Sequence, residues 1–431
     1  MKKILIATLI LCTTFMYSQK EANIWYFGEN AGLDFNSGVP VALTNGKLDT
    51  EEGCATISDK NGNLLFYTNG IVVYNRNHTI MLNGTGLNGN DTSTNSALII
   101  PKPNNSDIYY IFTVDFQAGA KGLQYSEVDM TLNGGLGGIT TNKNIILETP
   151  VTEKLTAIKN PISNEYWLVS HKWASNEFIS YKITNTGVNL TPVISAVGSI
   201  VIGGTPDNSR AIGDIKISPD GTKLAVARLE FEVQLFDFNA TSGKVSNPIT
   251  LINYSEYSHT YGIEFSPNSK VLYVSDFYDG VFQYNLNLSS TTDIINSKIE
   301  LAGPDNTKVY GVLQLAIDGK IYIANYLDFL DVINKPNVVG VGCNYDVETI
   351  SLDGRYSKLG LPPFIQSFFN TSFNFNNLCY GDTTQFTLTD TVDSVVWDFG
   401  DAASGVNNTS TAIVPTHIFT SPGDYTVTVT A

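Results

Sequence analysis

The side chains best suited to chemistry are aromatic, histidine and acidic residues that stand in loops between apolar runs. Their spacing matches no common catalytic pattern: the chain has no G-x-S-x-G nucleophile elbow, no H-E-x-x-H pair and no sialidase-type Asp box. The glycine-rich run 83–91 lacks the Gly-Lys-Ser/Thr ending of a phosphate-binding loop. We therefore predict no catalytic residue, no metal and no cofactor.

A set of loop residues instead combines aromatic rings with hydrogen-bonding groups, which is typical of a carbohydrate- or peptide-binding surface. The candidate ligand-binding residues are His171, Trp173, Tyr257, His259, Asp276, Tyr278 and Tyr326. No third ligand at a diagnostic spacing accompanies the two histidines, so the pattern does not indicate a metal. Carboxylates from separate loops could also converge, and a polysaccharide-active hydrolase or lyase is the alternative.

A repeat of β-rich units positions these loops. The first strands of six units are predicted to start near residues 55, 97, 157, 215, 263 and 313. The intervals between successive strand starts are typical of propeller blades of about 40–50 residues with loop insertions. Turns such as 59–62 and 218–221 carry Pro, Asp, Asn and Gly between β-branched and aromatic runs. The N-terminal run 24–38 adds a partial unit, and we expect 363–375 to supply its closing partner.

We therefore predict an all-β chain with a seven-bladed β-propeller over residues 19–370, with six blades as the alternative. In such a blade the innermost strand comes first. The loop into that strand and the loop between the second and third strands then open on the same rim. The candidate ligand-binding residues belong to these loops, so they should gather on one rim.

The C-terminal segment has a different pattern, with the runs 396–401 (VWDFGD), 417–419 and 422–426. These runs closely resemble the signature of PKD domains. The resemblance implies an immunoglobulin-like β-sandwich over 371–431, with Trp397 and Tyr425 in its core. We expect this domain to lack its last strand.

Several N-terminal and junction motifs carry a wider resemblance. They are 23–38 (NIWYFGENAGLDFNSG), 51–75, 84–91 and 360–369 (GLPPFIQSFF). They resemble a family of large secreted Bacteroidetes proteins, associated with gliding motility, in which a propeller precedes PKD repeats and a type B sorting domain. The resemblance implies the type IX secretion machinery as a partner and a chain that is a fragment. The SPDG-type turns also resemble YVTN and TolB-like propellers.

The first residues predict export. Lys2 and Lys3 precede the apolar run 4–15, and Ser18 offers a small residue before a cut. This is the pattern of a signal peptide over 1–18, cleaved before Gln19. The run is too short for a bilayer span, which takes about 20 residues. The sequence therefore predicts a secreted or cell-surface protein without a membrane span.

The net charge and the cysteines give further expectations about partners and disulfides. Removing 1–18 takes the net charge from −16 to −18, which argues against a nucleic-acid partner. Cys54 is expected to be a buried thiol, while Cys343 and Cys379 flank the domain junction and are the predicted disulfide. The leading functional hypothesis is a surface interaction or adhesion protein. Its rim would bind a glycan or protein, with the PKD domain as a spacer or accessory binding module.

Overall fold

The computed structural model describes residues 20–204, 208–253, 259–369, 373–377, 379–388, 395–425 and 427–430. The predicted signal peptide and Tyr257 lie outside these residues. The chain divides into two compact units, residues 20–370 and residues 371–431. In the described residues no helix is long and apolar enough to cross a membrane.

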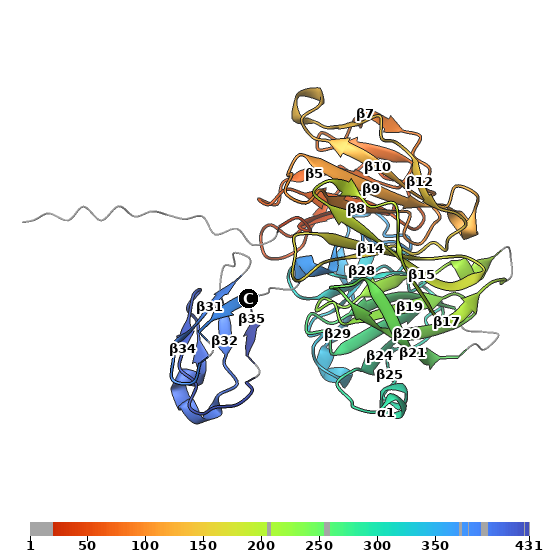
Figure 1. Cartoon of the computed structure of the whole chain (residues 1–431). Coiled ribbons are helices and arrows are strands. Elements are labelled where there is room, and N and C mark those ends of the chain that lie inside the picture. The colour runs from red at the N-terminus through yellow and green to blue at the C-terminus, as the bar shows by residue number, and fades with distance from the viewer. Residues whose placement is uncertain are drawn as a thin grey trace, which may run out of the picture. The chain divides into compact units, whose positions relative to one another are not determined.

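The larger unit is built from antiparallel sheets that follow one another in chain order (Figure 1). The first sheet has three strands: β1 (Ile24–Phe27), β2 (Ala31–Asp34) and β3 (Val41–Leu43). The second has β4 (Ala55–Ser58), β5 (Leu64–Thr68), β6 (Val72–Asn75) and β7 (Ile80–Thr85). The third has β8 (Ala97–Pro101), β9 (Ile108–Val114), β10 (Leu123–Asp129), β11 (Gly138–Ile139) and β12 (Ile145–Glu148). A parallel pairing of Leu82 with Gly138 joins the outer strands of the second and third sheets.

The later sheets repeat the same meander. The fourth has β13 (Thr156–Lys159), β14 (Tyr166–His171), β15 (Ser175–Thr184), β16 (Gly187–Val188) and β17 (Val193–Val201). The fifth has β18 (Ile215–Ile217), β19 (Lys223–Arg228), β20 (Glu232–Asn239) and β21 (Lys244–Ile252). The sixth has β22 (Thr260–Phe265), β23 (Val271–Asp276), β24 (Gly280–Asn285) and β25 (Ile299–Ala302). The last has β26 (Leu313–Leu315), β27 (Ile321–Ile323), β28 (Phe329–Ile333) and β29 (Tyr345–Ser351).

Helices are short in both units. The α-helix α1 (Thr291–Asn296) precedes β25, and its N-terminus is capped by the Ser290 side chain, which accepts from the Asp293 backbone N–H. The 3-10 turns are η1 (Phe116–Ala118), η2 (Asn133–Gly135), η3 (Ser209–Ala211), η4 (Gly340–Cys343), η5 (Gln366–Phe369) and η6 (Ala402–Asn408). The all-β expectation is therefore confirmed.

Inner strands are buried on both faces because each sheet packs between two others. Every residue of β22 and β23 is buried, for example, and apolar and polar residues do not strictly alternate along these strands. One apolar cluster joins each neighbouring pair of sheets from the second to the last. A further cluster packs Tyr322 and Val332 of the last sheet against Trp25 and Phe35 of the first. The sheets thus contact in circular order, which is a propeller-like arrangement, here called the ring.

The junction of the first and last sheets differs from the expectation that 363–375 would supply a strand. That expectation is wrong: η5 (Gln366–Phe369) replaces a strand there. The segment 361–369, here called the strap, packs into the ring interior instead. Phe364 contacts Trp25 at 5.9 Å between ring centroids, Ile365 is fully buried, and the Lys159 N–H donates to Ser367 Oγ (3.2 Å). An aromatic-rich segment gains more by this burial than at an exposed sheet edge.

The smaller unit holds two three-stranded sheets. One is β30 (Phe373–Asn376), β31 (Thr384–Leu388) and β34 (Thr416–His417). The other is β33 (Thr409–Ser410), β32 (Val396–Asp398) and β35 (Thr428–Thr430). Trp397 is fully buried between them, and its indole N–H donates to the Ala412 carbonyl (2.9 Å). His417 is also buried and lies 3.0 Å from the Asp401 carboxylate.

Candidate functional site

Three of the predicted ligand-binding residues come together where β22 begins and β23 ends. Asp276 is buried, and its carboxylate accepts from the backbone N–H groups of His259 (2.7 Å), Tyr278 (3.2 Å) and Asp279 (3.2 Å). The Tyr278 ring stands edge-on to the His259 ring at 5.0 Å and is 54% exposed. Asp276 therefore fixes two loops, and Tyr278 presents an aromatic surface to solvent.

The turn that carries Tyr278 depends on the glycine that follows. Gly280 has a φ of +110°, a conformation that other residues rarely adopt. A Cβ at this position would lie 1.9 Å from the Ala302 carbonyl oxygen. The close approach of the neighbouring strand therefore requires glycine and holds the Tyr278 loop in place.

Tyr326 lies in the equivalent loop of the last sheet, with separate contacts. Its hydroxyl donates to the Glu51 carboxylate, and this hydrogen bond raises the pKa of Tyr326. The Lys358 ammonium lies 4.8 Å from the Tyr326 ring centroid and 3.8 Å from both Glu29 and Glu51. One ammonium thus faces two carboxylates, which leaves the surroundings of Tyr326 acidic.

The fourth sheet places its two predicted residues differently. Trp173 is half-buried, and its backbone N–H donates to the Pro150 carbonyl (3.2 Å). His171 is fully buried, with Nδ1 2.8 Å from the Lys172 carbonyl and its ring against Phe178 at 4.6 Å. Burial, with nearby Arg228, lowers the pKa of His171 well below its usual value. His171 is therefore a neutral interior residue and does not lie on the exposed surface.

A group of buried acids was missed by the sequence reasoning. Glu153 is fully buried and accepts from the Thr94 backbone N–H (2.8 Å), the Thr94 hydroxyl (3.0 Å) and the Gln117 N–H (2.7 Å). Glu52 accepts from the Tyr261 hydroxyl (2.8 Å). Burial raises the pKa of both carboxyl groups, and Glu153 raises that of Glu52 further. The two buried carboxyl groups thus interact electrostatically.

The neighbouring lysine has a structural set of contacts. Lys154 is fully buried and donates to the carbonyls of residues 211–213 at 2.7 to 3.0 Å. Burial lowers its pKa to about 7. The Asn95 amide donates to Asp214 (3.1 Å) across the same region. These contacts join segments from the third, fourth and fifth sheets.

Three successive inner strands carry a further buried polar group. The Lys216 ammonium lies 3.2 Å from Glu264 and 2.7 Å from the Gln314 side-chain oxygen. All three side chains are buried, and Glu264 also accepts from the Leu315 N–H (3.0 Å). The sequence contains a signal for this contact, because each residue stands between two apolar ones (IKI, IEF and LQL) in the first strand of its unit. The interior charges thus pair with one another and connect the sheets.

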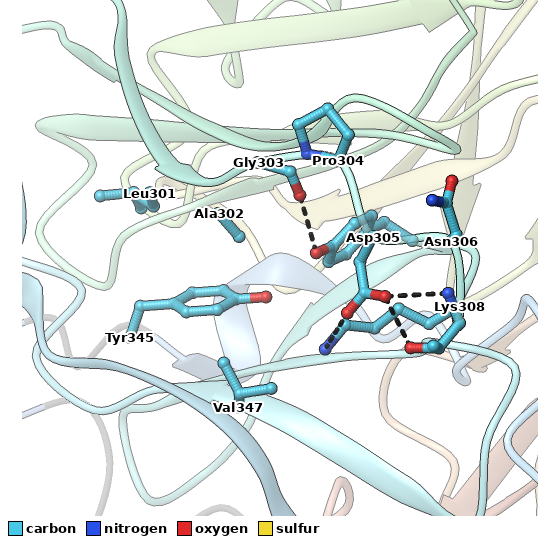
Figure 2. A pocket seen from close by; sticks show the side chains of 11 residues that line it. Leu301, Ala302, Gly303, Pro304, Asp305, Asn306, Lys308, Tyr345 and Val347 are labelled. Carbon is cyan, nitrogen blue, oxygen red and sulfur yellow. Dashed lines mark hydrogen bonds and ion pairs between the residues drawn. The ribbon is translucent and has the colours of Figure 1, made fainter.

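A groove of about 650 Å³ lies between the last strand of the sixth sheet and that of the last sheet. Figure 2 shows Leu301 and Ala302 on one side and Tyr345 and Val347 on the other, with Asp305 beside Lys308. The Lys308 ammonium lies 3.2 Å from Asp331, which also accepts from the Tyr345 hydroxyl (2.6 Å). None of the residues predicted from the sequence lines this groove.

The three cysteines among the described residues, Cys54, Cys343 and Cys379, are free thiols. Cys54 is fully buried in the core, as expected, and burial raises its thiol pKa. Cys343 is buried beside Tyr273 in the cluster between the sixth and last sheets, and Cys379 is exposed in the smaller unit. A bridge between Cys343 and Cys379 stays a prediction.

Comparison with known proteins identifies the smaller unit. The family model of the PKD domain matches residues 371–431. No curated protein shows significant sequence similarity to the chain. The immunoglobulin-like sandwich expected from the VWDFGD run is therefore supported by a family match and by two packed sheets.

Solved structures resemble the larger unit at low identity. A candidate 6-phosphogluconolactonase from Bacteroides fragilis is 14% identical, with 85% of this chain and 98% of that chain covered and a TM-score of 0.43. The periplasmic gluconolactonase PpgL of Pseudomonas aeruginosa is 12% identical, with 78% and 88% covered and a TM-score of 0.40. The β-propeller domain of Myceliophteria thermophila Cps50 (Swd1) is 8% identical, with 71% and 94% covered and a TM-score of 0.40. Likeness at this level carries no argument about activity. The chain is an all-β protein with a propeller-like unit followed by a PKD domain.

Proposed function

We propose that this chain is a secreted or cell-surface interaction protein whose propeller rim binds a glycan or protein ligand. One observation carries the proposal: Tyr278 exposes its ring on loops that the buried Asp276 holds rigid through three backbone hydrogen bonds. A preorganised aromatic surface loses little conformational entropy on binding, which favours recognition. Tyr326, with its acidic surroundings, and Trp173 extend this surface around the rim.

The interior supports binding over catalysis. Lys154, Lys216 and Glu264 are buried and direct their polar atoms at other groups of the ring. Buried charges satisfied in this way stabilise one arrangement of the sheets. A rim ligand would therefore meet a rigid platform in which these three charged groups already have partners.

The location and architecture complete the proposal. We infer a ring of seven blades, in which the three-stranded sheet β1–β3 counts as one blade. The signal-like run 1–18 and the PKD domain favour an extracellular site, and the family resemblance favours export through type IX secretion and a role in adhesion. The PKD domain serves as a spacer or accessory binding module.

A glycan and peptide array probed with the mature chain, residues 19–431, tests the rim. Tyr278→Ala should weaken any hit at least about fivefold, because exposed aromatic anchors dominate such contacts. Tyr326→Ala should act in the same direction if the ligand spans both loops. Ile162→Ala is the control, since that apolar side chain is 77% exposed in the loop between β13 and β14 and is not a candidate ligand-binding residue. Hits that keep full strength in Tyr278→Ala, Tyr326→Ala and Trp173→Ala would refute the rim proposal.

A hydrolase or lyase is the second candidate, and the Glu52 and Glu153 pair favours it. Both carboxyl groups have a raised pKa, and Tyr261 donates to one of them. Acids with raised pKa values are typical of general acid catalysts. Release of reducing sugar from a polysaccharide panel by the wild type, lost in Glu153→Gln, would establish this candidate in place of pure binding.

A further inference from the structure

The PKD unit contains a hollow of its own, of about 790 Å³. Aromatic side chains supply much of its wall; they are Phe373, Phe375, Tyr380, Phe386, Phe419 and Tyr425. Two of them keep large exposed surfaces, Phe375 at 52% and Tyr380 at 63%. Rings with this exposure can contact a ligand without any rearrangement of the core.

Contacts within the PKD unit hold the aromatic rings of this wall in place. Phe373 packs edge-on against the buried Trp397 at 5.0 Å, and Phe419 lies 4.3 Å from Tyr425. The Tyr425 hydroxyl donates to the Ser421 carbonyl (2.8 Å) and fixes the far side. The hollow is therefore a shaped feature of the sandwich, with rings fixed on both sides.

The PKD unit carries negative charge that no lysine or arginine of the unit balances. Residues 371–431 contain six aspartates and no glutamate, lysine or arginine. Two of these aspartates, Asp382 and Asp424, line the hollow and are exposed. No lysine or arginine of the unit is available to neutralise them, so the hollow attracts positive charge and repels anions.

We propose that this hollow binds a cationic side chain, the ammonium of lysine or the guanidinium of arginine, on a basic peptide segment of a partner protein. A cation over an aromatic face gains electrostatic attraction from the ring, and nearby carboxylates add to it. A neutral sugar could stack on the rings and donate hydroxyl hydrogen bonds to the carboxylates, but only a cation also gains the charge attraction of both carboxylates and of the ring faces. This site is separate from the rim of the proposed function, so either can fail without the other.

Fluorescence anisotropy with the mature chain tests the proposal directly. The probe is a fluorescein-labelled penta-lysine peptide, with penta-glutamate and cellohexaose as the anionic and neutral comparisons. We expect penta-lysine to bind, its affinity to fall as salt is added, and penta-glutamate not to bind. Binding of cellohexaose in place of penta-lysine would overturn the proposal in favour of a glycan site.

Substitutions separate this site from general attraction to an acidic protein. The double variant Asp382→Asn with Asp424→Asn should weaken penta-lysine binding about tenfold, which is about threefold for each exposed charge. Tyr380→Ala should weaken it about two- to fivefold. Asp353→Asn, an exposed aspartate of the propeller unit, should leave it unchanged. Equal affinity in the double variant and the wild type would refute the proposal.

Cys379 provides an independent readout, because it lines the hollow and is exposed while Cys54 and Cys343 are buried. In the reduced chain, a cationic trimethylammonium methanethiosulfonate should modify Cys379 faster than its anionic sulfonate analogue. The ratio of the two rates should fall in the double aspartate variant toward the ratio measured with a small free thiol, and penta-lysine should slow both reactions. Equal rates in the wild type, or a thiol that reacts with neither reagent, would contradict the proposal. A thermal melt of each variant verifies that the PKD unit is folded.

Discussion

At the level of single residues, the ring is marked by charged side chains that are buried in its interior. Lys216, Glu264 and Gln314 form one contact, and Glu52 with Tyr261 forms another. Removing a charge from water is costly unless its partners replace the lost hydration. These residues therefore favour one mutual arrangement of the sheets, and their protonation is linked to folding.

The raised pKa of Glu52 determines the direction in which folding stability changes with pH. Its folded-state pKa is raised by burial, so the folded chain binds the proton more tightly than the unfolded chain. The stability this group contributes is present below the unfolded pKa of about 4.3 and is lost as pH rises through the folded value. Glu52→Gln, a neutral isostere that can still accept from Tyr261, should match the wild type near about pH 4.5 and be more stable than the wild type near about pH 8.

Urea denaturation of both proteins across this pH range measures the effect. Glu300→Gln, at an exposed position, is the control and should keep the wild-type pH dependence. Parallel pH profiles for Glu52→Gln and the wild type would show that Glu52 is not the linked group.

Among the larger elements, the strap contacts the apolar clusters of several sheets. Its Phe364 packs on the first sheet, its Ile365 on the third and fourth sheets, and its Phe369 contacts the cluster between the sixth and last sheets. Gly360 precedes the strap and lies against the loop between β3 and β4. A Cβ at this position would lie 1.7 Å from the Glu52 carbonyl oxygen. The strap thus supplies an apolar filling that several sheets share.

Ile365→Ala should destabilise the propeller unit by about 2–5 kcal/mol, because a fully buried side chain is lost and a cavity remains. Equilibrium unfolding in urea, followed by near-UV circular dichroism, measures this change. Ile162→Ala is the control, since that side chain is 77% exposed and should cost about 0.5 kcal/mol or less. A cost for Ile365→Ala as small as the control's would mean that the strap is not part of the core.

Across the whole chain, two units with separate apolar cores share one polypeptide. The core of the PKD unit consists of Phe386, Val395, Trp397 and Phe399, and none of the ring clusters includes these residues. Separate cores imply separate cooperative transitions.

Differential scanning calorimetry should therefore show that a core substitution shifts the unfolding transition of its own unit only. Trp397→Ala removes a fully buried indole and should destabilise the PKD unit by about 3–5 kcal/mol. The propeller transition should stay where it is, and Ile365→Ala should show the reverse pattern. A single transition that both substitutions shift equally would indicate that the units unfold together.

Much of the architecture could be predicted from local sequence. First strands were expected near residues 55, 97, 215 and 313, and β4, β8, β18 and β26 begin at those positions. The VWDFGD run located the PKD domain that the family model matches at 371–431. Asp276 and Tyr278 were chosen for their types, and the structure explains their association through the Asp276 carboxylate.

The amino-acid sequence by itself determined the strands, their turns and the order of the two units, because these depend on residues a few positions apart. The tertiary structure decided which polar residues the ring encloses. His171 and Trp173 stand two apart in the sequence, yet one is buried and the other half-buried. Lys216 meets Gln314 across 98 residues of chain, and such contacts exist only after the intervening sheets have packed. The packing of the strap depends on the same long-range burial, which no local pattern encodes.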